Sequence, residues 1–310
     1  MLDVKRMRVL REIAAQGSFS AAADALYLSQ SAVSQHLAAL EREVGQKLVE
    51  RSRSGPRLTQ AGEVLVSHAD AVLARLDEAE RELAAIAGLQ GGKLRLASFP
   101  TASATLLTSA MSRFAELYPE VRLELREAEP EESVPQLKQG VHDLALTYSY
   151  ETVDEPEDRD VERHLLLEDR MWLAVPKNHR LSGKAAVSIA ELSDEAWLCG
   201  NGAATCRQNV ILACRGAGFD PRIAFESDDY QVLQGLIASG LGVTLLPDLA
   251  LTALHPGVAV VPVKPRPPIR YVWAATRAEG SRSPAADAMV EILREVGDRY
   301  AAETAAVVAA

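Results

Sequence analysis

The strongest constraint on this chain lies in residues 18–42, which read SFSAAADALYLSQSAVSQHLAALER. Serines and glutamines recur there at helical spacing beside a stripe of alanine and leucine. Solvated helices usually carry charged side chains opposite such a stripe, yet this outer face is uncharged and can form hydrogen bonds. A segment of this kind suits a binding partner that itself presents hydrogen-bond donors and acceptors.

Three short helices are expected in the first 45 residues. The first has apolar residues at helical spacing and stops at Gly17. The second begins after Ser18 or Ser20, either of which can cap it. Ser29 can cap the third helix, which Gly45 ends. On that third helix four apolar residues form one buried stripe: Val33, Leu37, Leu40 and Val44.

Two brief strands and one long helix are expected next. Residues 48–49 and 57–58 can pair around a turn at residues 54–56, which read Ser-Gly-Pro. Residues 59–89 lack proline, and their apolar residues alternate at spacings of three and four, as in the seam of a coiled coil: Leu65, Ala69, Val72, Leu76, Ala79, Leu83 and Ile86. A lone helix this polar outside its seam needs a partner helix. Gly88, Gly91 and Gly92 are expected to end it at a hinge.

The pattern changes after Lys93, where strands begin to alternate with helices of about 10–15 residues. KLRLASF, EVRLELREA, HDLALTY, RMWLAVP, PRIAFES, GVTLLP and IRYVWAAT are the expected strands. This alternation predicts parallel sheets with helices on both faces. The acidic residues 151–162 are expected to form a surface loop or a crossing segment, and the Ala-rich end is expected to fray after Ala302.

The charge of the chain is uneven. Residues 1–60 carry nine Lys and Arg against six Asp and Glu, which is +3, whereas the whole chain carries −10. The other 250 residues therefore hold −13. A basic N-terminal module on an acidic body is found in nucleic-acid binders, although the total charge argues against a protein that coats nucleic acid.

Composition also restricts the compartment and the cofactors. No apolar run reaches the roughly 18–20 residues of a membrane span, and charges near the start exclude a signal-peptide core. We therefore expect a cytoplasmic protein with no membrane partner. Three cysteines without a CxxC pair are neither a disulfide framework nor a metal site, and no cofactor is expected.

The third helix has the residues that a DNA-reading helix needs. Glutamine can bond both N6 and N7 of adenine, serine reaches base edges or phosphates, and alanine packs on thymine methyls. Acids occur on this helix only at its far end, at Glu41 and Glu43. The small side chains before it allow close packing, as a helix-turn-helix requires. The alternative is a polar helix that merely covers a core.

The segment GSFSAAADALYLSQSAVSQHLAALEREVGQKLVERSRSGPRLTQAG resembles the winged helix-turn-helix of LysR-type transcriptional regulators. It contains Ser-Phe before an Ala-Ala pair, Ser-Gln-Ser-Ala-Val-Ser, Leu-Glu-x-x-x-Gly, Leu-Val-Glu-Arg and Leu-Thr-x-x-Gly. This match covers residues 3–62. Similar motifs continue to about residue 300: GKLRLASF, FAELYPEVRLELRE, DLAL and ASGLGVTLLP.

The resemblance implies an α/β chain with an all-α N-terminal module. A winged helix-turn-helix is expected at 1–60, a dimerising linker helix at 61–90, and a two-lobed effector domain resembling periplasmic binding proteins at 91–302. Lobe I would hold residues 91–160 and 270–302, and lobe II residues 161–269. Such a protein is a bacterial regulator and not an enzyme. It would act as a homodimer or homotetramer on an interrupted palindrome in double-stranded DNA. A small-molecule effector would bind between the lobes, and an activator would also contact RNA polymerase.

Carried over by position, four residues would face the major groove: Gln30, Ser31, Ser34 and Gln35. Many relatives have Arg where Gln35 stands, so the base preference there is open. Phosphates would be held by Ser18, Arg51 and Thr59, while Arg53 and Arg57 would lie on the wing near the minor groove. The alternative for these arginines is an ordinary solvated surface role.

Ligands of two-lobed α/β domains bind at the carboxyl ends of strands, often on helix N-termini. Four segments fit that description: SFPTAS, TYS, CGNGAATCR and ESDD. Asp228 and Asp229 argue against a purely anionic ligand, because two carboxylates near one site repel it. Every residue proposed for this cleft could instead be a cap or turn residue. The proposed effector-binding residues are Ser98, Pro100, Thr101, Ser103, Thr147, Asn201, Thr205 and Ser227.

Cys206 and Cys214 are eight residues apart on one expected helix. The peroxide-sensing branch of the family has a redox pair in about this place, but the spacing here differs by one residue. That difference turns the second sulfur to another helix face. We expect Cys214 to be a small core residue and leave open whether Cys206 is redox-active.

Two other classes of protein remain as alternatives. An enzyme is one, but the chain has no GxSxG elbow, no HExxH motif and no phosphate loop. A solute-binding protein with an N-terminal oligomerisation arm is the other, and both the missing export signal and the third helix oppose it. The effector, the target genes, and the choice between activation and repression are not written in the sequence.

Overall fold

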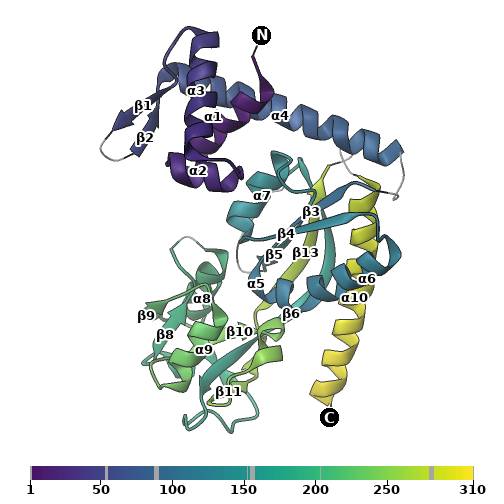
Figure 1. Cartoon of the computed structure of the whole chain (residues 1–310). Helices are drawn as coiled ribbons and strands as arrows, with labels where there is room; N and C mark the ends of the chain where they lie inside the picture. Colours follow the sequence, from purple (N-terminus) through teal and green to yellow (C-terminus); the bar gives the residue numbers. More distant parts are fainter. Residues whose placement is uncertain are drawn as a thin grey trace. The chain divides into compact units, whose positions relative to one another are not determined.

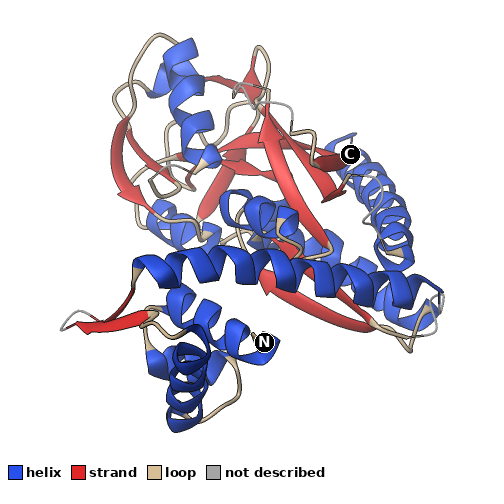
Figure 2. Cartoon of the chain, turned by 90° about the horizontal axis from the view of Figure 1, so that it is seen from above, coloured by secondary structure: helices blue, strands red, loops and turns tan. Residues whose placement is uncertain are grey.

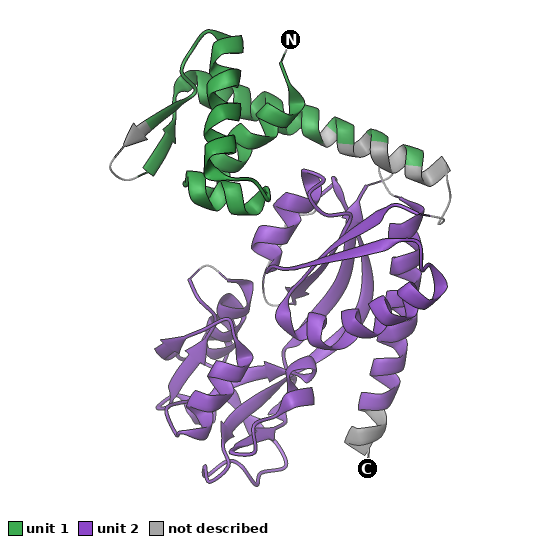
Figure 3. Cartoon of the chain, in the orientation of Figure 1, with its two compact units in different colours: residues 1–83 green, residues 84–310 purple. Residues whose placement is uncertain are grey.

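The computed structural model describes residues 2–52, 55–86, 91–151, 153, 158–202, 204–278 and 283–309. They form two compact units, residues 1–83 and residues 84–310, shown in Figure 3. Within the described residues, no helix is both long and apolar enough to cross a membrane.

The first unit begins with three helices, α1 (Val4–Gln16), α2 (Phe19–Ala25) and α3 (Gln30–Val44). Gly17 and Gly45 end α1 and α3 in the left-handed backbone region that favours glycine. Ser29 caps α3, as predicted, by accepting a hydrogen bond from the Ala32 amide. Of the two serines considered for α2, Ser18 is the cap, whereas Ser20 lies inside the helix.

A small hairpin and a long helix complete this unit. Strands β1 (Val49–Ser52) and β2 (Gly55–Leu58) pair antiparallel and project from the helices, as Figures 1 and 2 show. Helix α4 (Gln60–Ile86) follows, so both the predicted wing and the predicted linker helix are present. Gly88 of the predicted hinge lies outside the described residues.

The predicted seam of α4 divides between two environments. Leu65 and Ala69 are buried in the core of the first unit, together with α1 and α3 residues, and Leu73 is buried as well. By contrast, Val72, Leu76 and Leu83 are exposed, with Leu83 67 % exposed. Sequence spacing alone could not separate the part of the stripe that the chain covers itself from the part left for a partner.

A mixed sheet of seven strands organises the second unit. Its order is β10-β6-β13-β5-β3-β4, with β11 also paired to β6. The strand bounds are β3 (Lys93–Ser98), β4 (Arg122–Glu127), β5 (Leu144–Tyr150), β6 (Val161–Pro176), β10 (Thr244–Pro247), β11 (Val258–Val261) and β13 (Ile269–Arg277). β3 is parallel to β4 and β5, but β13 runs antiparallel to both β5 and β6. The expected purely parallel sheet is therefore wrong.

Helices cover both faces of the sheet. α7 (Pro130–Lys138) packs on β5 and β13, while α10 (Pro284–Ala309) packs on β6 and on α6 (Thr108–Leu117). Between β3 and α6 lie α5 (Pro100–Ala102) and a π-helical turn, η1 (Ser103–Leu107). The expected fraying after Ala302 does not occur, because α10 continues to its last described residue.

A second group of elements makes the other lobe of this unit. It contains α8 (Thr205–Gly216), α9 (Tyr230–Ala238) and the parallel pair β8 (Ala196–Cys199) and β9 (Arg222–Glu226). Smaller pieces are β7 (Val187–Ser188), β12 (Val263–Lys264), η2 (Ile189–Leu192) and η3 (Asp248–Ala253). β6 is far longer than the predicted strand, because one end pairs with β13 and the other with β10 and β11. It thus joins the two lobes.

Candidate DNA-binding and effector sites

The outer face of α3 is presented to solvent as predicted. Gln30, Ser31 and Gln35 are exposed and Ser34 is half-buried, while Val33, Leu37 and Leu40 on the opposite face are buried in the core. The Ser31 hydroxyl lies 2.9 Å from that of the capping Ser29. This face carries hydrogen-bonding groups and no carboxylate near the helix N-terminus, which is the chemistry that a base edge requires.

The remaining predicted DNA contacts lie around the hairpin and the helix starts. The Ser18 hydroxyl accepts from the Ala21 amide, and the Thr59 hydroxyl donates to the Lys47 carbonyl at 2.7 Å. In this structure, both hydroxyls therefore form hydrogen bonds within the DNA-binding unit. Arg57 on β2 is exposed. The side chain of Arg51 and the whole of Arg53 lie outside the described residues.

Two residues of the quoted motifs have structural tasks that sequence reasoning missed. Glu41, although acidic, is only 9 % exposed, and its carboxylate accepts from Lys47 Nζ at 2.7 Å and from the Leu48 amide at 3.0 Å. Burial raises the pKa of Glu41, but these hydrogen bonds outweigh burial and hold the pKa below its usual range. A β-carbon at Gly62 would lie 2.1 Å from the Leu48 carbonyl oxygen. Both residues therefore tie the hairpin to the helices.

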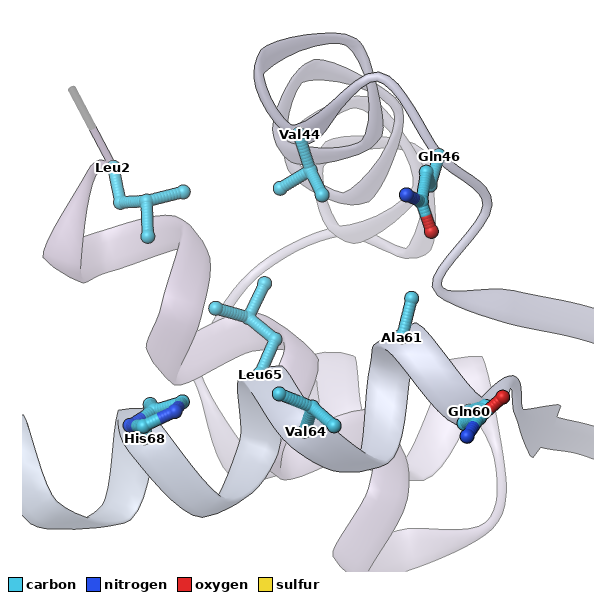
Figure 4. Close-up of a pocket in the computed structure, with 8 residues that line it drawn as sticks. All are labelled: Leu2, Val44, Gln46, Gln60, Ala61, Val64, Leu65 and His68. Atoms are coloured by element: carbon cyan, nitrogen blue, oxygen red, sulfur yellow. The ribbon is translucent and has the colours of Figure 1, made fainter.

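An open apolar groove of about 580 Å³ lies in the first unit beside the start of α4 (Figure 4). Leu2 before α1, Val44 at the end of α3, and Val64 on α4 point toward it. Val64 is 56 % exposed and Leu2 is 42 % exposed. Val72 and Leu76, further along α4, are also exposed apolar residues.

The first-lobe wall of the second unit is built around a buried ion pair. Arg270 on β13 is 1 % exposed and donates to the Asp169 carboxylate on β6 at 2.5 and 2.9 Å. Its guanidinium also donates to the Thr101 hydroxyl at 3.0 Å and lies 5.0 Å from the Phe99 ring centroid. The predicted residue Thr101 is thus bound to the arginine at the junction of β6 and β13.

Two glutamates from the start of α7 border the same region. Glu129 accepts a hydrogen bond from the Tyr148 hydroxyl at 2.9 Å. Burial is the main reason that the pKa of Glu129 rises to about 7, and nearby Glu131 raises it further, whereas Tyr148 lowers it. Glu131 reaches the second lobe, where its Oε1 accepts from the Thr205 amide at 2.8 Å and the Thr205 hydroxyl at 2.7 Å. A first-lobe carboxylate thus caps the N-terminus of α8, whose own cap residue Ala204 provides no side-chain bond.

The second-lobe wall contains Asp228, Asn201 and Cys206. Asp228 accepts from the Asn201 backbone amide and side-chain amide, each at 2.8 Å. A β-carbon at Gly200 would lie 2.4 Å from the Cys206 sulfur and 3.0 Å from an Asp228 oxygen, so the glycine permits this close approach. The cavity beside them is about 20 Å³, room for about one water molecule, and Ser227 also lines it.

The other predicted effector residues are placed differently. Ser98 is fully buried and donates to the Phe99 carbonyl, and Ser103 donates to the Ser98 carbonyl. Pro100 is the first residue of α5. Thr147 on β5 is 1 % exposed, and its hydroxyl has no hydrogen-bond partner in the described structure. Of the predicted residues, Thr205 makes a contact between the lobes, Thr101 is held by Arg270, and Asn201 and Ser227 lie beside Asp228 in the second lobe. Sequence reasoning missed Glu129, Glu131 and Arg270.

The cysteines have the properties of inert thiols. Burial, together with the nearby Glu129 and Asp228 carboxyl groups, raises the pKa of Cys206 to about 12. Burial also raises the pKa of Cys214 to about 12, and this side chain is fully buried. A peroxide-sensing cysteine needs an accessible thiolate with a lowered pKa. The expectation of Cys214 as a core residue is confirmed.

Comparison with known proteins assigns both units to recognised sequence families. Residues 4–63 match the family "Bacterial regulatory helix-turn-helix protein, lysR family", and residues 87–298 match "LysR substrate binding domain". The chain is 30 % identical over 294 residues to the probable HTH-type transcriptional regulator LrrA of Synechococcus elongatus, covering 95 % of this chain and 97 % of that protein. It is 29 % identical over 273 residues to the transcriptional dual regulator OxyR of Escherichia coli, covering 86 % and 87 %.

A solved structure shares the fold over most of the chain. Full-length CbnR in complex with its target DNA superposes with a TM-score of 0.68 at 24 % identity, covering 95 % of this chain and 100 % of that chain.

Proposed function

The chain belongs to the LysR family of bacterial transcriptional regulators, and from this premise we propose how its residues divide the work. Members of this family bind DNA and small-molecule effectors and act as oligomers; they are regulators and not enzymes. Residues 1–60 form the DNA-binding domain, 61–90 the linker and 91–302 the effector domain. Lobe I holds 91–160 and 270–302, and lobe II holds 161–269. Because the partner is DNA, its compartment is the cytoplasm.

Recognition of the DNA base sequence is assigned to the exposed face of α3. The observation that carries this assignment is that Gln30, Ser31 and Gln35 are exposed on a face without acids, with Ser34 half-buried between them. Phosphate contacts are assigned to Ser18, Arg51 and Thr59, and minor-groove contacts to Arg53 and Arg57. The operator is an interrupted palindrome, because a two-fold dimer presents two copies of α3.

The second protomer of the homodimer is proposed to pack against α4 and the groove beside it. Val72 and Leu76, four residues apart on α4, form an exposed apolar strip, and burying such a strip against a second copy removes apolar surface from water. Leu2, Val44 and Val64 line the groove of Figure 4. This supports the homodimer as the basic unit, from which a tetramer is built.

The test is a titration of DNA from upstream of the gene against random DNA, read by fluorescence anisotropy at several salt concentrations. Gln35→Ala is expected to weaken binding to the upstream DNA by about 5–150-fold and to leave random DNA unchanged, since one base contact is worth about 1–3 kcal/mol. Arg57→Ala is expected to weaken both by a similar factor and to lower the salt slope by about one. Glu116→Gln, an exposed change on α6, is the control. Equal losses on both DNAs from Gln35→Ala and Arg57→Ala would contradict the assignment.

A further inference from the structure

A pair of hydrogen bonds joins the two lobes of the effector domain outside the strands that connect them. The Glu131 carboxylate, in the first turn of α7, accepts from the backbone amide of Thr205 at 2.8 Å and from the Thr205 hydroxyl at 2.7 Å. α7 lies in the first lobe and α8 in the second (Figure 1). The two residues are 74 positions apart in the chain, so this contact exists only while the two lobes lie against each other.

The start of α8 depends on the Glu131 carboxylate. The first amides of a helix have no acceptor within the helix, and the cap residue Ala204 provides no side-chain hydrogen bond to them. Glu131 supplies that acceptor from the other lobe. A negative charge at a helix N-terminus is also stabilised by the helix dipole, and Glu131 lies in the first turn of its own helix as well. One carboxylate therefore serves the N-termini of two helices, one in each lobe.

Apolar packing brings the same two parts together but does not fix their alignment. α8 contacts β5 of the first lobe. The half-buried Cys206 of α8 packs against an apolar cluster that contains Tyr148 and Tyr150 of β5 together with Val210 of α8. Apolar contacts are non-directional, whereas the two bonds to Glu131 require a particular distance and angle. The hydrogen bonds are thus the part of this contact that forms in one alignment of the lobes and breaks in another.

We propose that Glu131 and the first turn of α8 form a latch that holds the two lobes together, and that release of this latch is a step in the response of the effector domain. This inference rests on the effector-binding role proposed above for residues 91–302. Both bonds lie in an exposed position, where water can replace either partner, so their net contribution is small. A contact of this strength shifts readily between a latched and a released population when a ligand favours one of them.

The alternative is that Glu131 only stabilises the first turn of α8 and has no effect on the lobes. The two roles differ at Cys206, the residue after Thr205. If the latch holds the lobes together, its loss exposes the Cys206 thiol, which packs against residues of both lobes. If the bonds matter only for the end of the helix, the thiol stays covered by that packing. The reactivity of Cys206 therefore reports on the lobes.

The experiment uses the full-length protein and measures the rate at which N-ethylmaleimide labels each cysteine, read by mass spectrometry. Glu131→Ala is expected to raise the labelling rate of Cys206 by about tenfold or more, because two hydrogen bonds to a carboxylate are lost. Cys214, which is buried in the second lobe, should label as slowly as before. Glu132→Ala is the matched control, because it removes the neighbouring exposed carboxylate of α7, whose hydrogen bonds stay within the first lobe.

Two changes at Thr205 test the other side of the latch. Thr205→Ser keeps both donors, so Cys206 should be labelled as in the unchanged protein. Thr205→Val keeps the amide and loses the hydroxyl, so labelling should be about three- to tenfold faster. Glu131→Ala combined with Thr205→Val should label no faster than Glu131→Ala alone, because both changes break the same contact. Release should also change the affinity for upstream DNA by about fivefold or more in Glu131→Ala.

Equal labelling of Cys206 in Glu131→Ala and Glu132→Ala would overturn the latch, as would effects of Glu131→Ala and Thr205→Val that multiply in the double variant. Labelling of Cys214 that rises with that of Cys206 would mean unfolding of the lobe and would also overturn it. An unchanged affinity for upstream DNA would overturn the part of the latch in the response. If the unchanged protein prefers upstream DNA to random DNA while Glu131→Ala has no effect on labelling, the latch fails and the regulatory function stands. If the unchanged protein shows no such preference, the regulatory function fails, whatever the labelling rates.

Discussion

Replacing Glu129 by glutamine should make the effector domain more stable at alkaline pH and nearly unchanged at acidic pH. Glutamine keeps the shape of the side chain and can still accept the hydrogen bond from Tyr148, which is 2.9 Å from the carboxylate. What the change removes is a negative charge that forms in a buried place beside Glu131 and Asp228. The variant therefore isolates the cost of ionising this one group.

The magnitude follows from the pKa of Glu129, which burial raises from 4.5 to about 7. The folded protein holds this proton over a pH range in which the unfolded chain has lost it. Stability therefore falls as the pH rises from about 4.5 to about 7, and it is flat above that range. At about 1.4 kcal/mol for each pKa unit, the loss is about 3 kcal/mol. Glu129→Gln should recover it at pH 8, which is about 6–12 °C in Tm for a domain of this size.

The assay is thermal unfolding followed by tryptophan fluorescence between about pH 5 and pH 8. The chain has three tryptophans, Trp172, Trp197 and Trp273, and all lie in the second unit. Their emission therefore reports on the effector domain without a contribution from the DNA-binding unit. Glu116→Gln is the matched control, because it removes an exposed carboxylate of the same unit.

A constant difference in Tm between Glu129→Gln and the unchanged protein across this pH range would refute the reasoning. The reasoning would also be refuted if Glu129→Gln and the unchanged protein lost the same amount of stability between pH 5 and pH 8. Either result would mean that Glu129 is not buried beside other carboxylates in solution.

Three further outcomes are expected. Leu76→Glu should shift the protein from dimer toward monomer in sedimentation at micromolar concentration, because it places a charge on the exposed apolar strip of α4; an unchanged dimer would contradict the strip as an interface. Cys206→Ser and the unchanged protein should bind DNA equally well in the presence of peroxide, because burial holds the pKa of the Cys206 thiol near 12. A peroxide response of the unchanged protein that Cys206→Ser abolishes would refute this. Gly62→Ala should destabilise the DNA-binding unit by about 1–3 kcal/mol, seen as a lower Tm by circular dichroism, because the new β-carbon meets the Leu48 carbonyl. Unchanged melting would refute the packing.

The DNA-binding unit was predicted well because its signals are local. Caps, glycine stops and helical stripes act within a few residues, and Gly17, Ser29 and Gly45 have the roles that their positions predicted. The same local rules left Ser18 and Ser20 equivalent, and only the backbone geometry before α2 distinguished them. The task of Glu41 could not be read locally either, since its partners lie six and seven residues further on, in the segment leading to the hairpin.

The contacts of the candidate effector residues could be predicted less completely, because they join distant segments. Turn and helix-start signals led to Thr101, which Arg270 contacts, and to Thr205, which meets Glu131 of the other lobe. They also led to Asn201 and Ser227, which lie beside Asp228 in the second lobe. Arg270 gave no such signal: it lies inside a strand and meets its partner Asp169 across 101 residues of chain. The contact between Glu131 and Thr205 spans 74 residues.

The sequence by itself determined the family, the order of the domains, the three helices with their hairpin, and the polar outer face of α3. These follow from periodicity and capping, which are properties of neighbouring residues. Tertiary structure alone decided the mixed sheet, the long β6 that joins the lobes, and the split of the α4 stripe into covered and exposed parts. It also decided which charged and polar groups meet across the chain, such as Arg270 with Asp169 and Glu131 with Thr205. Burial and charge pairing depend on what folds against a residue, and spacing along the chain does not record that.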